Sequence, residues 1–344
     1  MSRAFSKQGR RVINILVGHL ALLPDALSVS NVRLRNVHPV NRGGFAIIYR
    51  GYYQQTDDTE LDVALKVIPI FEHHSEEDRR RVFDKFSKEA LVWRYLKHPN
   101  VVPFLGIDST TFENQQRALV SPWMVQGSVL DFVAKNSPAA PYALELFHDI
   151  IEGLRYLHSE NVIHGDLCGR NILINRDERA CLSDFGLAAF VEAETSVKTS
   201  SRSGSRQWMS PELLNPPPGG HFKRTIASDV WAFACVCCEI WTEGTVPYSH
   251  LGKGDPGLHF ALGNAMQNPY KDKPQDKAGN EMPEQLWEFC QWCWSFEPSQ
   301  RPAVQMIVDV LSGMLPREMD VNIGSAPTGV EVPNGSPADA NVIT

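Results

Sequence analysis

Two short polar motifs in the middle of the chain constrain its fold more than any other feature. The run His164-Gly165-Asp166-Leu167-Cys168-Gly169-Arg170-Asn171 is followed, thirteen residues after Asn171, by Asp184-Phe185-Gly186. Asp166 and Asn171 stand five residues apart on one predicted loop, and Asp184 stands on the next. The fold must bring three oxygen-bearing side chains to one point, which suits a hard divalent cation and an acceptor hydroxyl.

The two motifs, taken together and in this order, resemble the catalytic and metal-positioning loops of eukaryotic protein kinases. The resemblance runs from about Val32 to Leu315, and its closest form is the tyrosine-kinase-like group of serine/threonine kinases. It implies an α+β, bilobal fold: a small antiparallel β-rich N-lobe with one key helix, and a larger helical C-lobe. It also implies ATP, Mg²⁺ and a protein substrate, with serine or threonine hydroxyls preferred to tyrosine as acceptors.

The resemblance gives each of the three polar side chains a role. Asp166 is the expected catalytic base, which orients the acceptor hydroxyl. Asn171 and Asp184 are the expected Mg²⁺ ligands.

The first motif departs from the family pattern at two positions. Gly165 replaces an arginine that in many kinases reads phosphorylation of the activation loop. Cys168 replaces a lysine that stabilises the γ-phosphate. Arg170 carries a positive charge at the place where many tyrosine kinases keep theirs, and is the expected substitute near the transition state. We therefore expect activity that does not depend on the usual phosphate-to-arginine switch.

The segment from Asn41 to Tyr49 (NRGGFAIIY) resembles a glycine-rich phosphate loop. In such a loop, missing side chains let backbone N–H groups approach the phosphates. Asn41 and Ala46 stand where the family has its first and third glycines, so an ordinary hairpin remains the alternative. The candidate nucleotide contacts are Gly43, Gly44 and Ile48.

Lys66 is the one charge in the apolar stretch Val63-Ala64-Leu65-Lys66-Val67. A buried ammonium needs a partner, and the resemblance supplies Glu89 on the following helix. Lys66 would then hold the α- and β-phosphates while Glu89 holds Lys66. The alternative is a lysine at the surface edge of the strand.

Residues 121–127 resemble the hinge that joins the two lobes, with Ser121 as a small residue beside the adenine. Pro122 is expected to offer its carbonyl and Met124 its N–H to the adenine, so the N–H that proline lacks is not needed. The other candidate contacts are Asp131 for the ribose, and Ala64 and Leu173, which would sandwich the adenine unless they are plain core residues.

Residues 184–212 resemble an activation loop that ends in a substrate-docking segment. Ser205 falls where serine/threonine kinases place a hydroxyl against the catalytic aspartate. Ser210-Pro211-Glu212 stands for the family's A-P-E, and the resemblance pairs Glu212 with Arg301 in a buried ion pair.

The pattern of apolar residues agrees with two lobes. Strand-like stretches run from about Val32 to Leu119 and are interrupted by one charged helix at about Glu76 to Leu96. Helical periodicity dominates after Asp131. One face of a buried helix is predicted at Leu144, Phe147, Ile151, Leu154 and Leu157.

The two ends of the chain read differently from the middle. Residues 1–31 are predicted to be an N-terminal helical extension, 32–315 the kinase domain, and 316–344 a disordered tail. The basic start and the apolar stretch from Val12 to Leu23 mimic a secretory signal, but polar and proline residues interrupt it. We expect this helix to dock on the domain or on a partner protein.

Bulk properties exclude several classes of function. The 344 residues, 43% of them hydrophobic, suffice for one bilobal domain, and a net charge of −7 gives no reason to expect nucleic acid as a partner. No apolar run reaches the ~20 residues of a membrane span. Seven cysteines, an odd number in apolar surroundings, predict buried thiols and a cytoplasmic protein. For Cys290 and Cys293, core packing is favoured over zinc or redox work.

Three functions remain open at this stage. An active protein kinase explains all the motifs. A pseudokinase scaffold, which binds ATP with little turnover, would explain the altered glycine loop and the changes at Gly165 and Cys168. A small-molecule phosphotransferase would explain Gly165, but such enzymes lack the docking segment at 210–212 and its partner Arg301.

Overall fold

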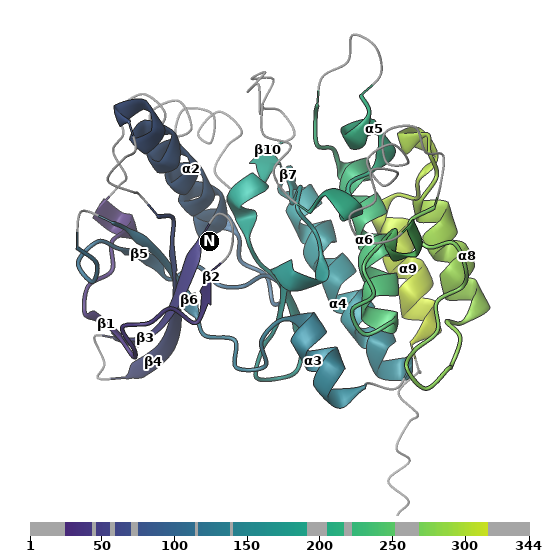
Figure 1. Ribbon diagram of the computed structural model, residues 1–344, viewed down its shortest axis with the longest axis horizontal. Coiled ribbons are helices and arrows are strands. Elements are labelled where there is room, and N and C mark those ends of the chain that lie inside the picture. The colour runs from purple at the N-terminus through teal and green to yellow at the C-terminus, as the bar shows by residue number, and fades with distance from the viewer. Residues whose placement is uncertain are drawn as a thin grey trace, which may run out of the picture.

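The computed structural model describes residues 25–42, 46–55, 59–69, 75–113, 116–137, 140–190, 205–216, 222–251 and 268–315. These residues form two lobes, one built on a sheet with a long helix and the other on a group of helices (Figure 1). The chain thus has the predicted α+β, bilobal fold. Gly43, Gly44, most of the predicted N-terminal helix and the tail 316–344 lie outside the described residues.

The N-lobe contains a six-stranded antiparallel sheet with the order β1-β3-β4-β6-β5, to which β2 adds on β3. Its strands are β1 (Val32–Leu34), β2 (Asn41–Arg42), β3 (Ile47–Gln54), β4 (Glu60–Val67), β5 (Gly106–Asp108) and β6 (Ala118–Pro122).

The central strand β4 presents two different faces, because successive side chains of a strand alternate. Val63, Leu65 and Val67 are buried in a cluster on one face. Ala64 and Lys66 are partly exposed on the other face, which is turned toward the second lobe.

The described end of the predicted N-terminal extension lies against this sheet. Asp25–Leu27 forms one 3₁₀ turn. The Val29 N–H then donates to the Ile107 carbonyl of β5 at 2.9 Å, so this part of the chain is extended backbone on the sheet.

The long helix in the described part of the N-lobe is α2 (Glu76–Tyr95), which matches the predicted span to within one residue. Ser75 caps it, because its side chain accepts the Asp78 N–H at 3.1 Å. Its first turn is acidic, which complements the positive end of the helix dipole. The C-terminal half of α2 is buried, including Glu89 and Trp93.

Helices build the C-lobe (Figure 1). They are α3 (Val129–Asn136), α4 (Ala140–Ser159), α5 (Pro211–Leu214), α6 (Ile226–Trp241), α8 (Glu284–Cys293) and α9 (Val304–Met314). The predicted apolar face of α4 is confirmed at Phe147, Ile151, Leu154 and Leu157, all of them 0% exposed. Helix α6 is buried over most of its length.

The two polar motifs lie in loops between short paired strands. Antiparallel pairs join β8 (Ile172–Ile174) to β9 (Ala180–Leu182), and β7 (Val162–Ile163) to β10 (Ala189–Phe190). The first motif fills the loop between β7 and β8, and the second follows β9. Pairing of β8 with β9 therefore brings the two motifs side by side.

All seven cysteines are buried free thiols, as the sequence predicts. Among the described residues, no helix combines the length and the apolar character needed to cross a membrane.

The predicted ion pair between Glu212 and Arg301 is present. Arg301 is 7% exposed, and its two terminal nitrogens each lie 2.8 Å from a Glu212 carboxylate oxygen. Its Nε donates to the Ser295 carbonyl at 2.9 Å. Burial opposes ionisation of Glu212, but the Arg301 guanidinium outweighs it and lowers the pKa of that carboxyl.

We expect Arg301→Met to lower the free energy of unfolding by ~3–5 kcal/mol, because it leaves the Glu212 carboxylate without its partner. Denaturant unfolding measures this loss. Arg155→Met is the matched control, since Arg155 is 47% exposed and pairs with Glu152 on the surface of α4; it should cost ~0–1 kcal/mol. Equal losses in the two variants would contradict this account of the pair.

Candidate active site

The Lys66 ammonium lies between two carboxylates from different parts of the fold. Its Nζ is 2.6 Å from Glu89 Oε1 and 2.6 Å from Asp184 Oδ1. Lys66 belongs to β4, Glu89 to α2, and Asp184 to the loop after β9. The Lys66 side chain is 14% exposed, which excludes the alternative of a surface-edge lysine.

The charges of this group support one another. Burial disfavours the Lys66 ammonium, but Glu89 and Asp184 more than offset it and raise the pKa of Lys66. Burial raises the pKa of Glu89, against the attraction of Lys66. For Asp184, desolvation is outweighed by the ammonium, which lowers the pKa of this carboxyl. Lys66 and Asp184 are therefore both charged at neutral pH.

A column of rings holds Asp184 in this position. The centroid of the Phe185 ring lies 5.8 Å from that of Trp93 on α2 and 5.6 Å from that of His164 in the first motif. Trp93 in turn lies 5.4 Å from Phe104. Because the column connects α2 to the C-lobe, the position of Phe185 fixes the neighbouring Asp184 beneath Lys66.

Gly186 completes the turn. A methyl group added there would lie 3.1 Å from Glu89 Oε2 and 3.2 Å from Asp184 Oδ1. This crowding explains why glycine follows Phe185 at the point where α2 and the loop meet.

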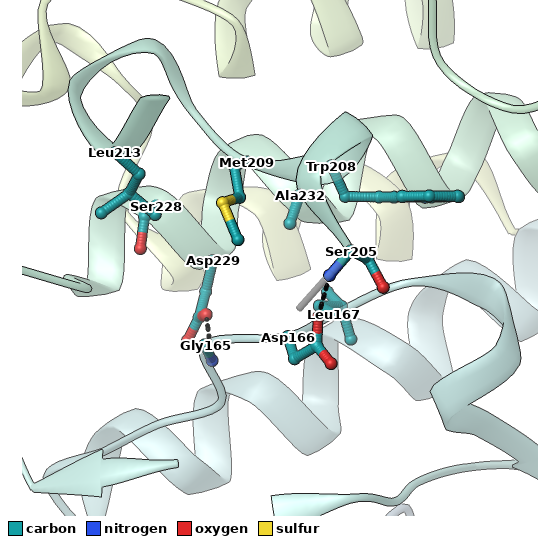
Figure 2. Close-up of a pocket in the computed structure, with 10 residues that line it drawn as sticks. All are labelled: Gly165, Asp166, Leu167, Ser205, Trp208, Met209, Leu213, Ser228, Asp229 and Ala232. Carbon is teal, nitrogen blue, oxygen red and sulfur yellow. Dashed lines mark hydrogen bonds between the residues drawn. The ribbon is translucent and has the colours of Figure 1, made fainter. Parts of the chain in front are cut away.

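The loop of the first motif is held from below by Asp229 at the start of α6. Its carboxylate accepts the N–H groups of His164 and Gly165, both at 2.9 Å, and Figure 2 shows it directed at Gly165. Burial disfavours this charge, but the hydrogen bond from His158 and the backbone donors lower the pKa of Asp229. A buried carboxylate thus anchors the loop.

The structure places Asp166 and Asn171 in contact and brings the backbone next to Asp184 alongside them. Asn171 Nδ2 donates to the Asp166 carbonyl at 2.7 Å and lies 3.3 Å from Asp166 Oδ2. The Ser183 N–H, next to Asp184, donates to the Asn171 carbonyl at 2.9 Å. The three polar side chains therefore come from two adjoining backbones, as the spacing of the motifs requires.

Asn171 and Asp184 suit a divalent cation. The Asn171 amide nitrogen donates to Asp166, so its amide oxygen is the atom that could bind a cation. The Asp184 side chain is 43% exposed and carries a charge. Hard oxygen donors of these two types are what Mg²⁺ prefers.

Ser205 contacts Asp166 in a different way from that predicted. Its backbone N–H, not its hydroxyl, donates to Asp166 Oδ1 at 2.8 Å (Figure 2). The hydroxyl instead donates to Cys168 Sγ at 3.3 Å. The reason is the sulfur atom, which offers the hydroxyl an acceptor where the family has a lysine.

Cys168 itself supplies no charge. It is 1% exposed, and burial together with the nearby Asp166 raises the pKa of its thiol to about 11. A cation on the same loop is Arg170, which is exposed and has its Cζ 5.8 Å from the Trp208 ring centroid.

Glu239 is a buried carboxylate that the sequence reasoning missed. One of its oxygens, Oε2, accepts both the Gly169 N–H and the Trp208 Nε1–H at 2.9 Å. Burial raises the pKa of Glu239 to about 7, although both hydrogen bonds oppose the shift. Its one signal in the sequence is an acidic residue in the otherwise apolar stretch Val230–Trp241.

The candidate adenine contacts lie on the sheet face around Lys66. Strand register places Ile48 opposite Lys66, and Ala64 opposite Ser121. Across from them, Leu173 lies in β8 and is partly exposed between two buried isoleucines.

The remaining hinge candidates come directly after β6. Pro122 ends this strand, and the Met124 carbonyl accepts the Gly127 N–H at 3.1 Å. The Asp131 carboxylate caps α3, since it accepts the N–H and the hydroxyl of Ser128 at 3.0 and 2.7 Å. A ribose would share Asp131 with this cap.

Comparison with known proteins gives one family. The family model described as protein tyrosine and serine/threonine kinase matches residues 34–311. The chain is 28% identical to serine/threonine-protein kinase STY17 of Arabidopsis thaliana, over 85% of this chain and 46% of that protein. It is 25% identical to tyrosine-protein kinase receptor svh-2 of Caenorhabditis elegans, over 86% of this chain and 26% of that protein. The chain thus spans less than half the length of these curated relatives.

Glu239 predicts a specific pH dependence. Its pKa is raised from the ordinary 4.5 to about 7 in the folded protein. The stability that its proton provides is full below about pH 4.5 and is lost as pH rises through about 7. Glu239→Gln should abolish this loss, so stability of the variant relative to wild type should grow by roughly 2–3 kcal/mol between these limits.

Denaturant unfolding at a series of pH values measures this difference. Glu288→Gln, at an exposed position of α8, serves as the control and should follow the wild-type curve. A Glu239→Gln curve parallel to wild type would show that folding does not raise the pKa of this carboxyl.

Proposed function

The chain belongs to the protein tyrosine and serine/threonine kinase family, and from this premise we propose that it transfers the γ-phosphoryl group of ATP to serine and threonine hydroxyls of a protein. The observation that carries the proposal is the Lys66 ammonium at 2.6 Å from both Glu89 and Asp184. A kinase needs this lysine paired and the aspartate beneath it in place before phosphates are bound productively.

Asp166 is the proposed base. The acceptor oxygen attacks the γ-phosphorus, the bond from that phosphorus to the bridging oxygen breaks, and ADP leaves with the electron pair. The proton of the acceptor hydroxyl passes to the Asp166 carboxylate. The contacts from Ser205 and Asn171 support the proposal, because they fix the direction in which this carboxylate points.

Asn171 and Asp184 are the proposed Mg²⁺ ligands. When bound there, Mg²⁺ would neutralise charge that develops on the phosphate oxygens. The two residues would contribute an amide oxygen and a carboxylate oxygen, and Lys66 keeps the Asp184 carboxylate ionised.

The proposed nucleotide site follows the same face of the sheet. Lys66 binds the α- and β-phosphates, and the backbone of Pro122 and Met124 binds the adenine. Ile48, Ala64, Leu173 and Asp131 complete the pocket, together with Gly43 and Gly44.

Arg170 is the proposed cation near the transferred group, since Cys168 is a neutral thiol. Its present position over Trp208 brings the guanidinium close to the docking segment. Because this side chain is exposed, its guanidinium is not confined to that position.

Serine and threonine are the proposed acceptors. Ser205 stands in the docking segment beside Asp166, and the relative STY17 is named a serine/threonine-protein kinase. The receptor svh-2 is named a tyrosine-protein kinase, so tyrosine is the acceptor that the experiment must separate from serine and threonine.

The domain limits and the location of the protein are part of the same proposal. We propose residues 32–315 as the kinase domain; most of the extension predicted before it, and the tail predicted after it, lie outside the described residues. A cytoplasmic location fits the seven buried free thiols.

Phosphate transfer from labelled Mg-ATP to a generic basic protein tests the function. The full chain should place label on serine or threonine, and hydrolysis of the product identifies the amino acid. Asp166→Asn should lower the rate ~10²-fold or more, because the carboxylate no longer accepts the proton. Asp177→Asn, at an exposed turn, is the matched control and should retain the wild-type rate.

Two results would contradict different parts of the proposal. Label on tyrosine alone would keep the kinase and change its acceptor. Nucleotide binding without transfer, in a folded protein, would favour the pseudokinase scaffold and make Cys168 the first residue to restore.

A further inference from the structure

Both backbone polar groups of Gly165, its N–H and its carbonyl, are hydrogen-bonded to side chains. Its N–H donates to Asp229 Oδ1 at 2.9 Å, which Figure 2 shows. Its carbonyl accepts Arg224 Nε–H at 2.7 Å. Both partners belong to one stretch, the residues that lead into and begin α6, so this stretch fixes the peptide groups on either side of Gly165.

A side chain at residue 165 would have no room. Gly165 has a φ of +77°, which residues other than glycine rarely adopt. A methyl group there would lie 3.0 Å from Arg224 Nε and from the Leu187 carbonyl oxygen, and closer still to Arg224 Cδ. The space of the missing side chain is thus filled by the stem of Arg224.

Arg224 is a buried cation next to the catalytic loop. It is 9% exposed, and its Cζ lies 4.9 Å from the Phe222 ring. Burial lowers the pKa of the guanidinium, while the charges of Asp166 and Asp229 act against that shift. A buried charge is costly unless it has partners. For Arg224 these partners include the charges of Asp166 and Asp229.

The family has an arginine where this chain has Gly165, and here a guanidinium comes to this position from another part of the chain. In related kinases, as the sequence motif implies, an arginine side chain starts at the residue before the catalytic aspartate. In this chain a guanidinium reaches the same peptide from residue 224. It comes from the segment that joins the docking region to α6, so it connects that segment to the catalytic loop.

We propose that Arg224 is a positioning residue for Asp166, which it holds through the Gly165 carbonyl and through the space that Gly165 leaves open. The proposal rests on the function proposed above. Asp166 directly follows the peptide that Arg224 binds, so a shift of that peptide turns the Asp166 carboxylate. A misplacement of about 1 Å at a reacting group can cost ~10²-fold in rate.

Two substitutions separate the hydrogen bond from the volume of the side chain. Arg224→Gln keeps a nitrogen donor at the place of Nε, and Arg224→Met has a similar stem with no donor. We expect Arg224→Met to lower kcat by ~10-fold or more with KM for ATP unchanged to within ~2-fold. Arg224→Gln should recover to within ~3-fold of wild type.

The surface variant Arg155→Met controls for the loss of an arginine, and thermal melting controls for the loss of fold. A purely structural role would lower the melting temperature of both Arg224 variants and leave kcat at equal amounts of folded protein unchanged. Equal kcat in Arg224→Gln and Arg224→Met, whether low or at the wild-type level, would overturn the proposal.

Hydrogen–deuterium exchange of residues 163–169 provides a readout that does not need activity. Arg224→Met should speed exchange of this segment, and Arg224→Gln should keep it near wild type. If the two variants differ in exchange as expected but the wild-type chain transfers no phosphate, the proposed function fails and the positioning role stands. If exchange is the same in all three proteins, the positioning role fails whatever the activity.

Discussion

The structure depends on one buried ammonium group and its two carboxylate partners. Lys66 would be expensive inside β4 without them, and neither partner lies near it in sequence. To bring Glu89 there, α2 must pack against the sheet with its buried half inward. To bring Asp184 there, Phe185 must fill the space beneath Trp93. The ring column and Gly186 therefore serve the same requirement. Each of them helps to hold α2 and the loop at Asp184 in the positions where both carboxylates reach Lys66.

The loop of the first motif, residues 164–171, is positioned by α6 and the residues just before it. Asp229, Glu239 and Arg224 all lie on this buried helix or just before it, and all three contact backbone groups of the loop. These contacts are polar and buried, so each is costly to break. A buried helix thus holds the peptide groups of the loop, on which the Asp166 carboxylate contacts Ser205 and Asn171.

Much of this could be predicted from the sequence, for physical reasons. Lys66 is the one charged residue in an apolar stretch. Glu89 lies on a helix whose N-cap serine and acidic first turn can be recognised in the sequence. Arg301 and Glu212 lie in recognisable motifs. The contacts that could not be predicted depend on tertiary packing. Nothing in the sequence places Arg224 against Gly165, because the two are far apart in the chain and the missing side chain is the relevant feature. Likewise, the choice of Ser205 between Asp166 and Cys168 depends on atomic positions, and Gly43 and Gly44 remain predictions.

The central claim is that Lys66 works only as part of the Lys66–Glu89–Asp184 group. A double-mutant cycle on kcat/KM tests it most directly, with wild type, Lys66→Met, Glu89→Gln and the double variant, each compared at equal amounts of folded protein. If the two residues act as one unit, the double variant should be no more than ~3-fold slower than Lys66→Met. If Glu89→Gln keeps the wild-type rate, or if the two losses multiply, Lys66 acts without Glu89 and the account is contradicted.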